Sequence, residues 1–185
     1  MLFTKWIGDL MQEKLSISIK KPSISKFEKG PNLSLVKYIL ANYPNKYALS
    51  VSRLIGILYL SDWKSALEKN NQITNVSWCL ESEGPYVDDF LKLAKNDPEI
   101  NVVNVGIAHS EKNKNVELRK NYHDSIKISF DDKETIDFVI KKTKDKSYAA
   151  FMRLVNSTYP VILSDHKGEI NMVKMAGDYR HLCSQ

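Results

Sequence analysis

The sequence is poor in cysteine. Its 185 residues include only Cys79 and Cys183, which stand far apart. Disulfide-stabilised domains and structural zinc sites need several cysteines at short, paired spacings. We therefore expect neither, and both thiols fit the reducing conditions of the cytoplasm. Cys79 lies in an apolar stretch, which predicts a buried thiol that behaves as a small hydrophobic group and not as a nucleophile.

Glycine and long apolar runs are also scarce. The seven glycines are scattered, and neither the dinucleotide-binding nor the Walker spacing occurs, which excludes a glycine-rich phosphate loop. No apolar run reaches the roughly 18 residues of a transmembrane helix. Residues 1–15 lack the layout of a signal peptide,. The sequence predicts a cytoplasmic protein without a membrane span.

Residues suited to catalysis do not form recognisable motifs. No two of the four histidines have the four-residue spacing of zinc proteases, and a catalytic metal needs several ligands in the right geometry. Ser157, Asp165 and His166 are residue types found in hydrolases, but the glycines of a nucleophile elbow are missing,. We expect no catalytic, metal or cofactor site, and so a protein that is not an enzyme.

Charge of one sign does not dominate. The net charge of +5 arises from 27 basic residues mixed among 22 acidic ones, with a pI near 9.0. A nucleic-acid-binding face needs clustered basic residues, and no helix-turn-helix pattern is present. We therefore do not expect nucleic acid as a partner, with binding of the protein's own operon DNA as the alternative.

A buried central helix is the strongest positive signal. With 43% hydrophobic and 26% charged residues, the chain can form a globular core,. Ser50 is a candidate N-cap, and the apolar residues that follow repeat at helical spacing on one stripe. The stripe consists of Leu54, Ile57, Leu58, Leu60, Trp63, Ala66 and Leu67.

The segment after this helix predicts a strand and a second helix. Residues 73–80 are rich in β-forming types. Gly84-Pro85 breaks this strand, and Pro85 is expected to begin a helix over 86–94, because proline is tolerated in a first helical turn. Asp88 and Asp89 would then lie near the positive end of the helix dipole.

The remaining pattern completes an α+β fold that is predominantly helical. A helix capped by Ser34 is expected to end at Leu40 or Tyr43, and further helices are expected over 133–144 and over 148–156. The hydrophobic pattern over 101–107 and 115–118 predicts a small antiparallel hairpin. Residues 1–32 predict an amphipathic helix and a linker, 33–176 one compact domain, and 177–185 a frayed tail.

The order of these features resembles the Panacea domain, also called the SocA-like domain. The likeness rests on a helix ending in Leu-Tyr-Leu-Ser-Asp at 58–62, a polar break, Ile73-Thr74, a strand, and a Gly-Pro turn. Asn75 stands where that family has glycine. A second similar stretch lies at 148–172, so the likeness covers roughly residues 33–172.

The resemblance implies an antitoxin that binds a protein toxin encoded nearby, or an adapter that delivers a toxin to a cellular protease. Most positions that match the family motif are expected to hold the fold, with toxin contacts on the variable surface. The motif and candidate toxin-binding residues are Leu60, Asp62, Ile73, Thr74, Trp78, Glu83, Gly84, Pro85 and Tyr86.

Two alternatives remain open at this point. One is a phage or mobile-element protein that uses the same domain to bind a host protein. The other is an enzyme that uses the acidic cluster Glu81, Glu83, Asp88 and Asp89, because paired carboxylates can act as acid and base. The simpler interpretation of that cluster is helix capping and solvation, or an acidic patch that meets a basic partner.

Overall fold

The computed structural model describes residues 33–103, 114–119, 126–164 and 168–184. The predicted N-terminal helix and linker, residues 1–32, lie outside the described residues. The elements in chain order are α2 (Leu33–Asn42), the 3-10 helix η1 (Lys46–Ala48), α3 (Val51–Lys69), β1 (Trp78–Glu81), β2 (Gly84–Tyr86), α4 (Asp88–Asn96), β3 (Ile100–Val103), β4 (Asn115–Leu118), α5 (Phe130–Thr143), α6 (Tyr148–Asn156), α7 (Tyr159–Leu163), β5 (Glu169–Ile170) and α8 (Met172–Cys183).

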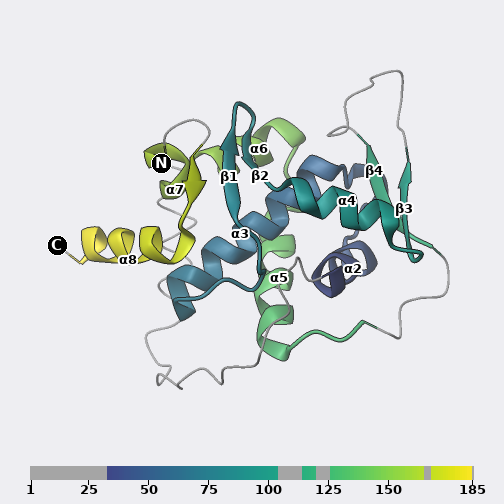
Figure 1. Ribbon diagram of the computed structural model, residues 1–185, viewed down its shortest axis with the longest axis horizontal. Helices are drawn as coiled ribbons and strands as arrows, with labels where there is room; N and C mark the ends of the chain where they lie inside the picture. The colour runs from purple at the N-terminus through teal and green to yellow at the C-terminus, as the bar shows by residue number, and fades with distance from the viewer. Residues whose placement is uncertain (1–32, 104–113, 120–125, 165–167, 185) are drawn as a thin grey trace.

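Helix α3 runs through the middle of the molecule (Figure 1). The predicted N-cap is confirmed, because the Ser50 side chain accepts a hydrogen bond from the backbone N–H of Arg53,. Asn70 ends the helix in the left-handed conformation, with φ of 58°, which asparagine tolerates better than most residues. Helix α3 is buried nearly all round, as the apolar sequence of its first half predicts.

Among the described helices, α2, α5, α6 and α8 pack against α3. The approach of α6 depends on Gly56, because a Cβ atom at this position would lie 2.6 Å from the Phe151 ring. Phe151 itself is fully buried. Gly56 therefore allows the two helices to come closer than any larger residue would permit.

A three-stranded antiparallel sheet with the order β2-β1-β5 covers part of α3. Leu80 pairs with Pro85 and Trp78 pairs with Ile170. The prediction that Pro85 begins a helix is wrong, because Pro85 lies in strand β2 and helix α4 begins only at Asp88. Proline is accommodated because β2 is an edge strand,. Strand β1 is also shorter than the predicted strand over 73–80.

The predicted hairpin is confirmed by the antiparallel pairing of β3 with β4. Residues 104–113, which include the second half of the predicted strand over 101–107, lie outside the described residues. A bridge between Ser50 and Asn115 and a hydrogen bond of 2.8 Å from Val51 N to the Lys114 carbonyl join β4 to the start of α3. The hairpin thus packs at the N-terminal end of the central helix.

The C-terminal end differs from the prediction. Residues 177–183 are helical, within α8, so the expectation of a frayed tail is wrong for them. The guanidinium of Arg180 donates to the carbonyl groups of Ala66 and Leu67 at 2.7 and 2.9 Å. Tyr179 packs edge-on against Trp63. These contacts hold α8 against the last turns of α3, where free carbonyl groups need donors.

Smaller differences concern helix starts. Ser34 lies inside α2 rather than capping it, and α5 begins at Phe130 with Ser129 as its cap, earlier than the predicted 133. Helix α6 matches its predicted range of 148–156.

The fold class is confirmed as α+β and predominantly helical with small antiparallel sheets. Within the described residues, no helix combines the length and apolar character needed to cross a membrane.

Candidate functional site

Asp62 is the centre of the motif residues. Its carboxylate is fully buried on α3. It accepts hydrogen bonds from the backbone N–H groups of Ile73 and Thr74 at 2.8 and 2.9 Å, from the Thr74 hydroxyl, from Trp78 Nε1 at 2.7 Å and from Gln72 Nε2 at 3.1 Å. The side chain therefore ties the whole 72–78 segment to the central helix.

The electrostatics of Asp62 combine two opposing effects. Burial raises its pKa above the ordinary value of 3.8, and the hydrogen bonds from Thr74, Trp78 and Gln72 oppose that rise,. A buried carboxylate is tolerated only when donors replace its lost water. Asp62 is consequently a fixed structural anchor, and it is shielded from any substrate.

The aromatic ring of Trp78 links this anchor to the C-terminal half of the chain. The ring packs edge-on against Tyr59, with centroids 5.3 Å apart. The Tyr59 hydroxyl and Thr158 Oγ1 lie 2.7 Å apart, and both residues are buried. Leu60 is also buried, and Ile73 packs against the same core. The motif residues Leu60, Asp62, Ile73, Thr74 and Trp78 thus form one group, and this group stabilises the fold.

The other four predicted residues form the turn and second strand of the β1–β2 hairpin. Gly84 has φ of +127°, and a Cβ atom there would lie 2.5 Å from Asn156 Oδ1. Only glycine adopts this conformation without strain. Strand β2 packs against α3 and α6, with Gly84 buried, Pro85 and Tyr86 half-buried, and Glu83 exposed. Glu83 is the one member of the nine that is exposed.

The structure describes the side chains of two of the four residues in the predicted acidic cluster. Glu81 is half-buried and Glu83 is exposed; both have interaction partners. The side chains of Asp88 and Asp89 lie outside the described residues. Among the described residues, no group of three or more acidic, histidine or cysteine side chains is arranged to hold a metal ion.

The sheet presents one face to solvent. Strand alternation turns Trp78, Leu80 and Ile170 inward and leaves Cys79 and Glu169 exposed as a cross-strand pair,. The prediction of a buried Cys79 thiol is therefore wrong. The apolar stretch around Cys79 gave a false signal, because its apolar neighbours fill only the inner face of the strand.

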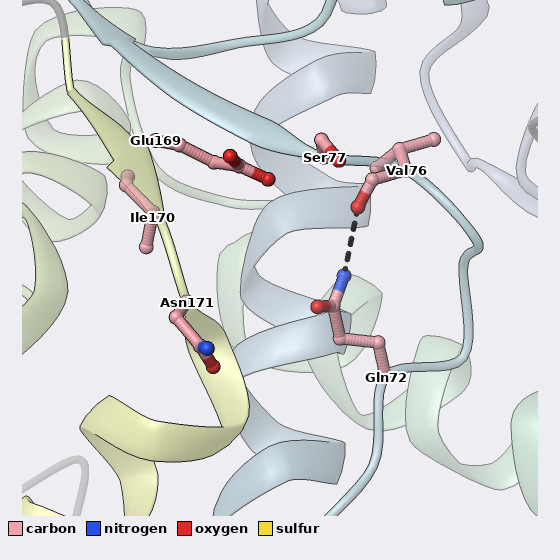
Figure 2. A pocket seen from close by; sticks show the side chains of 6 residues that line it. All are labelled: Gln72, Val76, Ser77, Glu169, Ile170 and Asn171. Carbon is pink, nitrogen blue, oxygen red and sulfur yellow. Dashed lines mark hydrogen bonds between the residues drawn. The ribbon is translucent and has the colours of Figure 1, made fainter.

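An open cavity of about 320 Å³ lies beside the motif anchor. Figure 2 shows Gln72, Val76 and Ser77 on one side and Glu169, Ile170 and Asn171 on the other. Gln72 joins the cavity to the anchor, because its Nε2 donates to both Asp62 and the Val76 carbonyl at 3.1 Å. We call the sheet face with Cys79 and Glu169, together with this cavity, the motif-side surface.

Sequence reasoning missed the second wall of this cavity. Glu169 and Asn171 carry no local motif, and they reach Ser77 only because β5 pairs with β1. Gln72 was predicted only as part of a polar break. The one available signal was the resemblance of residues 148–172 to the family's C-terminal stretch, which suggested that this segment belongs to the same domain.

The geometry defines a class of protein: a small helical domain with a buried motif and an exposed surface supported by it. A family model described as antitoxin SocA-like, Panacea domain matches residues 54–159. The match includes all nine predicted motif residues and lies within the stretch 33–172 that resembles the family. The chain belongs to the SocA-like Panacea domain family of antitoxins. Comparisons with curated proteins and with solved structures gave no match.

Proposed function

We propose that this chain is the antitoxin of a type II toxin–antitoxin pair and that it neutralises a toxin encoded nearby by direct binding in the cytoplasm. The observation that carries the proposal is the family match over residues 54–159. It is supported by the burial of the motif: Asp62, Thr74 and Trp78 are inside the fold. Such a motif serves as a scaffold, and it leaves the exposed surface free to vary with the partner.

The proposal assigns binding rather than catalysis to this chain. A catalytic carboxylate must reach the proton that it transfers. Asp62 cannot do so, because it is fully buried and surrounded by donors of its own chain. This arrangement supports a structural role for the most strongly held carboxylate of the motif.

The motif-side surface is the proposed site of toxin contact. The 72–78 segment is fixed by Asp62, so its exposed groups are held in place before the partner arrives, and preorganisation lowers the entropic cost of binding. Ser77, Glu169 and Asn171 are exposed here. The carboxylate of Glu169 favours a toxin surface of basic character, because complementary charge steers association.

Growth of cells that express the neighbouring open reading frame, with and without this chain, tests the proposal. Neutralisation predicts that growth is arrested by the neighbour alone, is rescued by this chain, and that the two products co-purify. Rescue without a complex would contradict direct binding and support delivery of the toxin to a protease. A harmless neighbour would contradict the antitoxin assignment and support a phage or mobile-element protein that binds a host protein.

A further inference from the structure

A second cavity, of about 650 Å³, lies where η1, the start of α3, strand β4 and the α5–α6 connection meet. It is distinct in its lining residues from the motif-side surface. Three basic side chains and one acidic side chain line it: Arg53, Lys144, Lys146 and Asp145. Its volume is in the range of small-molecule sites, and its lining carries a net positive charge.

Arg53 is the unusual member of this lining. The side chain is only 4% exposed, and its guanidinium lies 4.9 Å from the centre of the Phe151 ring. It donates to the Tyr43 hydroxyl and to the Lys146 carbonyl, both at 3.1 Å. Its Nε has no hydrogen-bond partner.

Arg53 forms no ion pair with a carboxylate in the described part of the chain, whose ion pairs involve other residues. Burying a cation without an anion costs free energy, and a buried donor without an acceptor adds to that cost. An anion in the cavity would relieve the first cost, that of the unpaired charge, whereas Nε is buried and does not reach the cavity. Arg53 therefore points to an anionic ligand.

Two helices add positive potential at the same place. Ser50 and Ser147, the N-caps of α3 and α6, both line the cavity. Several N–H groups at these helix starts already have acceptors within the protein, so the contribution of the helices to anion binding is that of the helix dipole. The buried guanidinium, the two lysines and the two helix starts together suit a doubly charged oxyanion better than a single carboxylate.

We infer that this cavity binds a phosphate group, either free or carried by a nucleoside. The rim can accommodate a nucleoside, because Tyr47 and Tyr148 line the cavity and are 94% and 47% exposed. Exposed aromatic rings are suited to stacking against a base. Arg53 holds the phosphate, and Lys144 and Lys146 attract it to the cavity.

Calorimetric titration of the full chain with inorganic phosphate, with adenosine monophosphate and with adenosine tests this inference. Wild type is expected to bind a phosphate-bearing probe, and Arg53→Gln to weaken that binding at least about tenfold, because a charge-assisted hydrogen bond is lost. Because Arg53 is buried, the pair Lys144→Ala/Lys146→Ala, at one exposed and one half-buried position, provides a second variant, with an expected loss of about threefold or more,.

The matched control is Lys141→Ala/Lys174→Ala, which removes the same charge from exposed positions outside the cavity and should leave affinity within about twofold of wild type. If adenosine monophosphate binds more tightly than inorganic phosphate, and Tyr47→Ala removes this difference, the ligand is a nucleoside phosphate. If the two probes bind equally, the ligand is free phosphate. Absence of binding to every phosphate probe, or equal weakening in both double variants, would overturn the inference.

Discussion

Asp62 shows how one residue organises a segment. Its carboxylate receives hydrogen bonds from donors as far along the chain as Trp78. The donors of Thr74 and Trp78 would otherwise be buried without an acceptor, because both residues are buried,. The family motif is therefore explained by satisfaction of buried polar groups, and this explanation does not require any motif residue to touch the toxin.

Replacing this carboxylate with its amide isostere tests that explanation. In Asp62→Asn, one acceptor oxygen becomes an NH₂ group that faces donors, so we expect a loss of about 2–4 kcal/mol in the free energy of unfolding. Urea unfolding followed by circular dichroism measures it. Asp137→Asn is the matched control, because Asp137 is exposed and accepts a single hydrogen bond, from the Tyr38 hydroxyl at 2.8 Å. Equal stability losses in the two variants would contradict the anchor role.

At the scale of elements, the β1–β2 hairpin depends on the conformation of one glycine. Gly84→Ala is expected to reduce stability by about 2 kcal/mol or more, because an L-residue is strained at φ of +127° and its Cβ would clash with Asn156,. Thermal unfolding detects this loss. The control is Gly177→Ala in α8, where the nearest atom to an added Cβ is 4.0 Å away. There alanine should be neutral or stabilising by up to about 1 kcal/mol; a loss as large as that of Gly84→Ala would refute the account.

The helices were predictable because their signal is local. The apolar stripe of α3 repeats within the helix itself, and a serine precedes both α3 and α6 at the cap position,. The burial of Asp62 could not be predicted in the same way, because its five hydrogen-bond donors surround it only after the chain turns back at Asn70. Sequence similarity marked Asp62, Thr74 and Trp78 as a set without revealing that they bond to one another.

Two elements were predicted poorly. Gly84-Pro85 has the local pattern of a helix start, yet Pro85 lies in a strand that pairs with the adjacent β1 and packs against α3 and α6. The C-terminal residues have no strong apolar run, yet Arg180 and Tyr179 fasten α8 to the end of α3. The packing of β2 and of α8 against helices that lie far away along the chain could not be predicted from periodicity and turn residues, because these report only local structure,.

At the scale of the molecule, the buried motif and the three-stranded sheet are directly connected. Helix α3 supplies Asp62, the 72–78 segment is tied to it, and β1 continues from that segment into the sheet β2-β1-β5 (Figure 1). The motif-side surface is therefore supported by the most buried part of the protein. This support holds the backbone of the surface in place beneath its exposed side chains.

The central claim is that this surface binds the toxin directly. The most direct test is the dissociation constant of the purified complex for wild type, Glu169→Lys and Glu134→Lys. The first variant reverses a charge on the motif-side surface and the second makes the same change on exposed α5. We predict that Glu169→Lys weakens binding about tenfold or more and that Glu134→Lys leaves it within about twofold of wild type. Equal affinities for all three proteins would contradict the account.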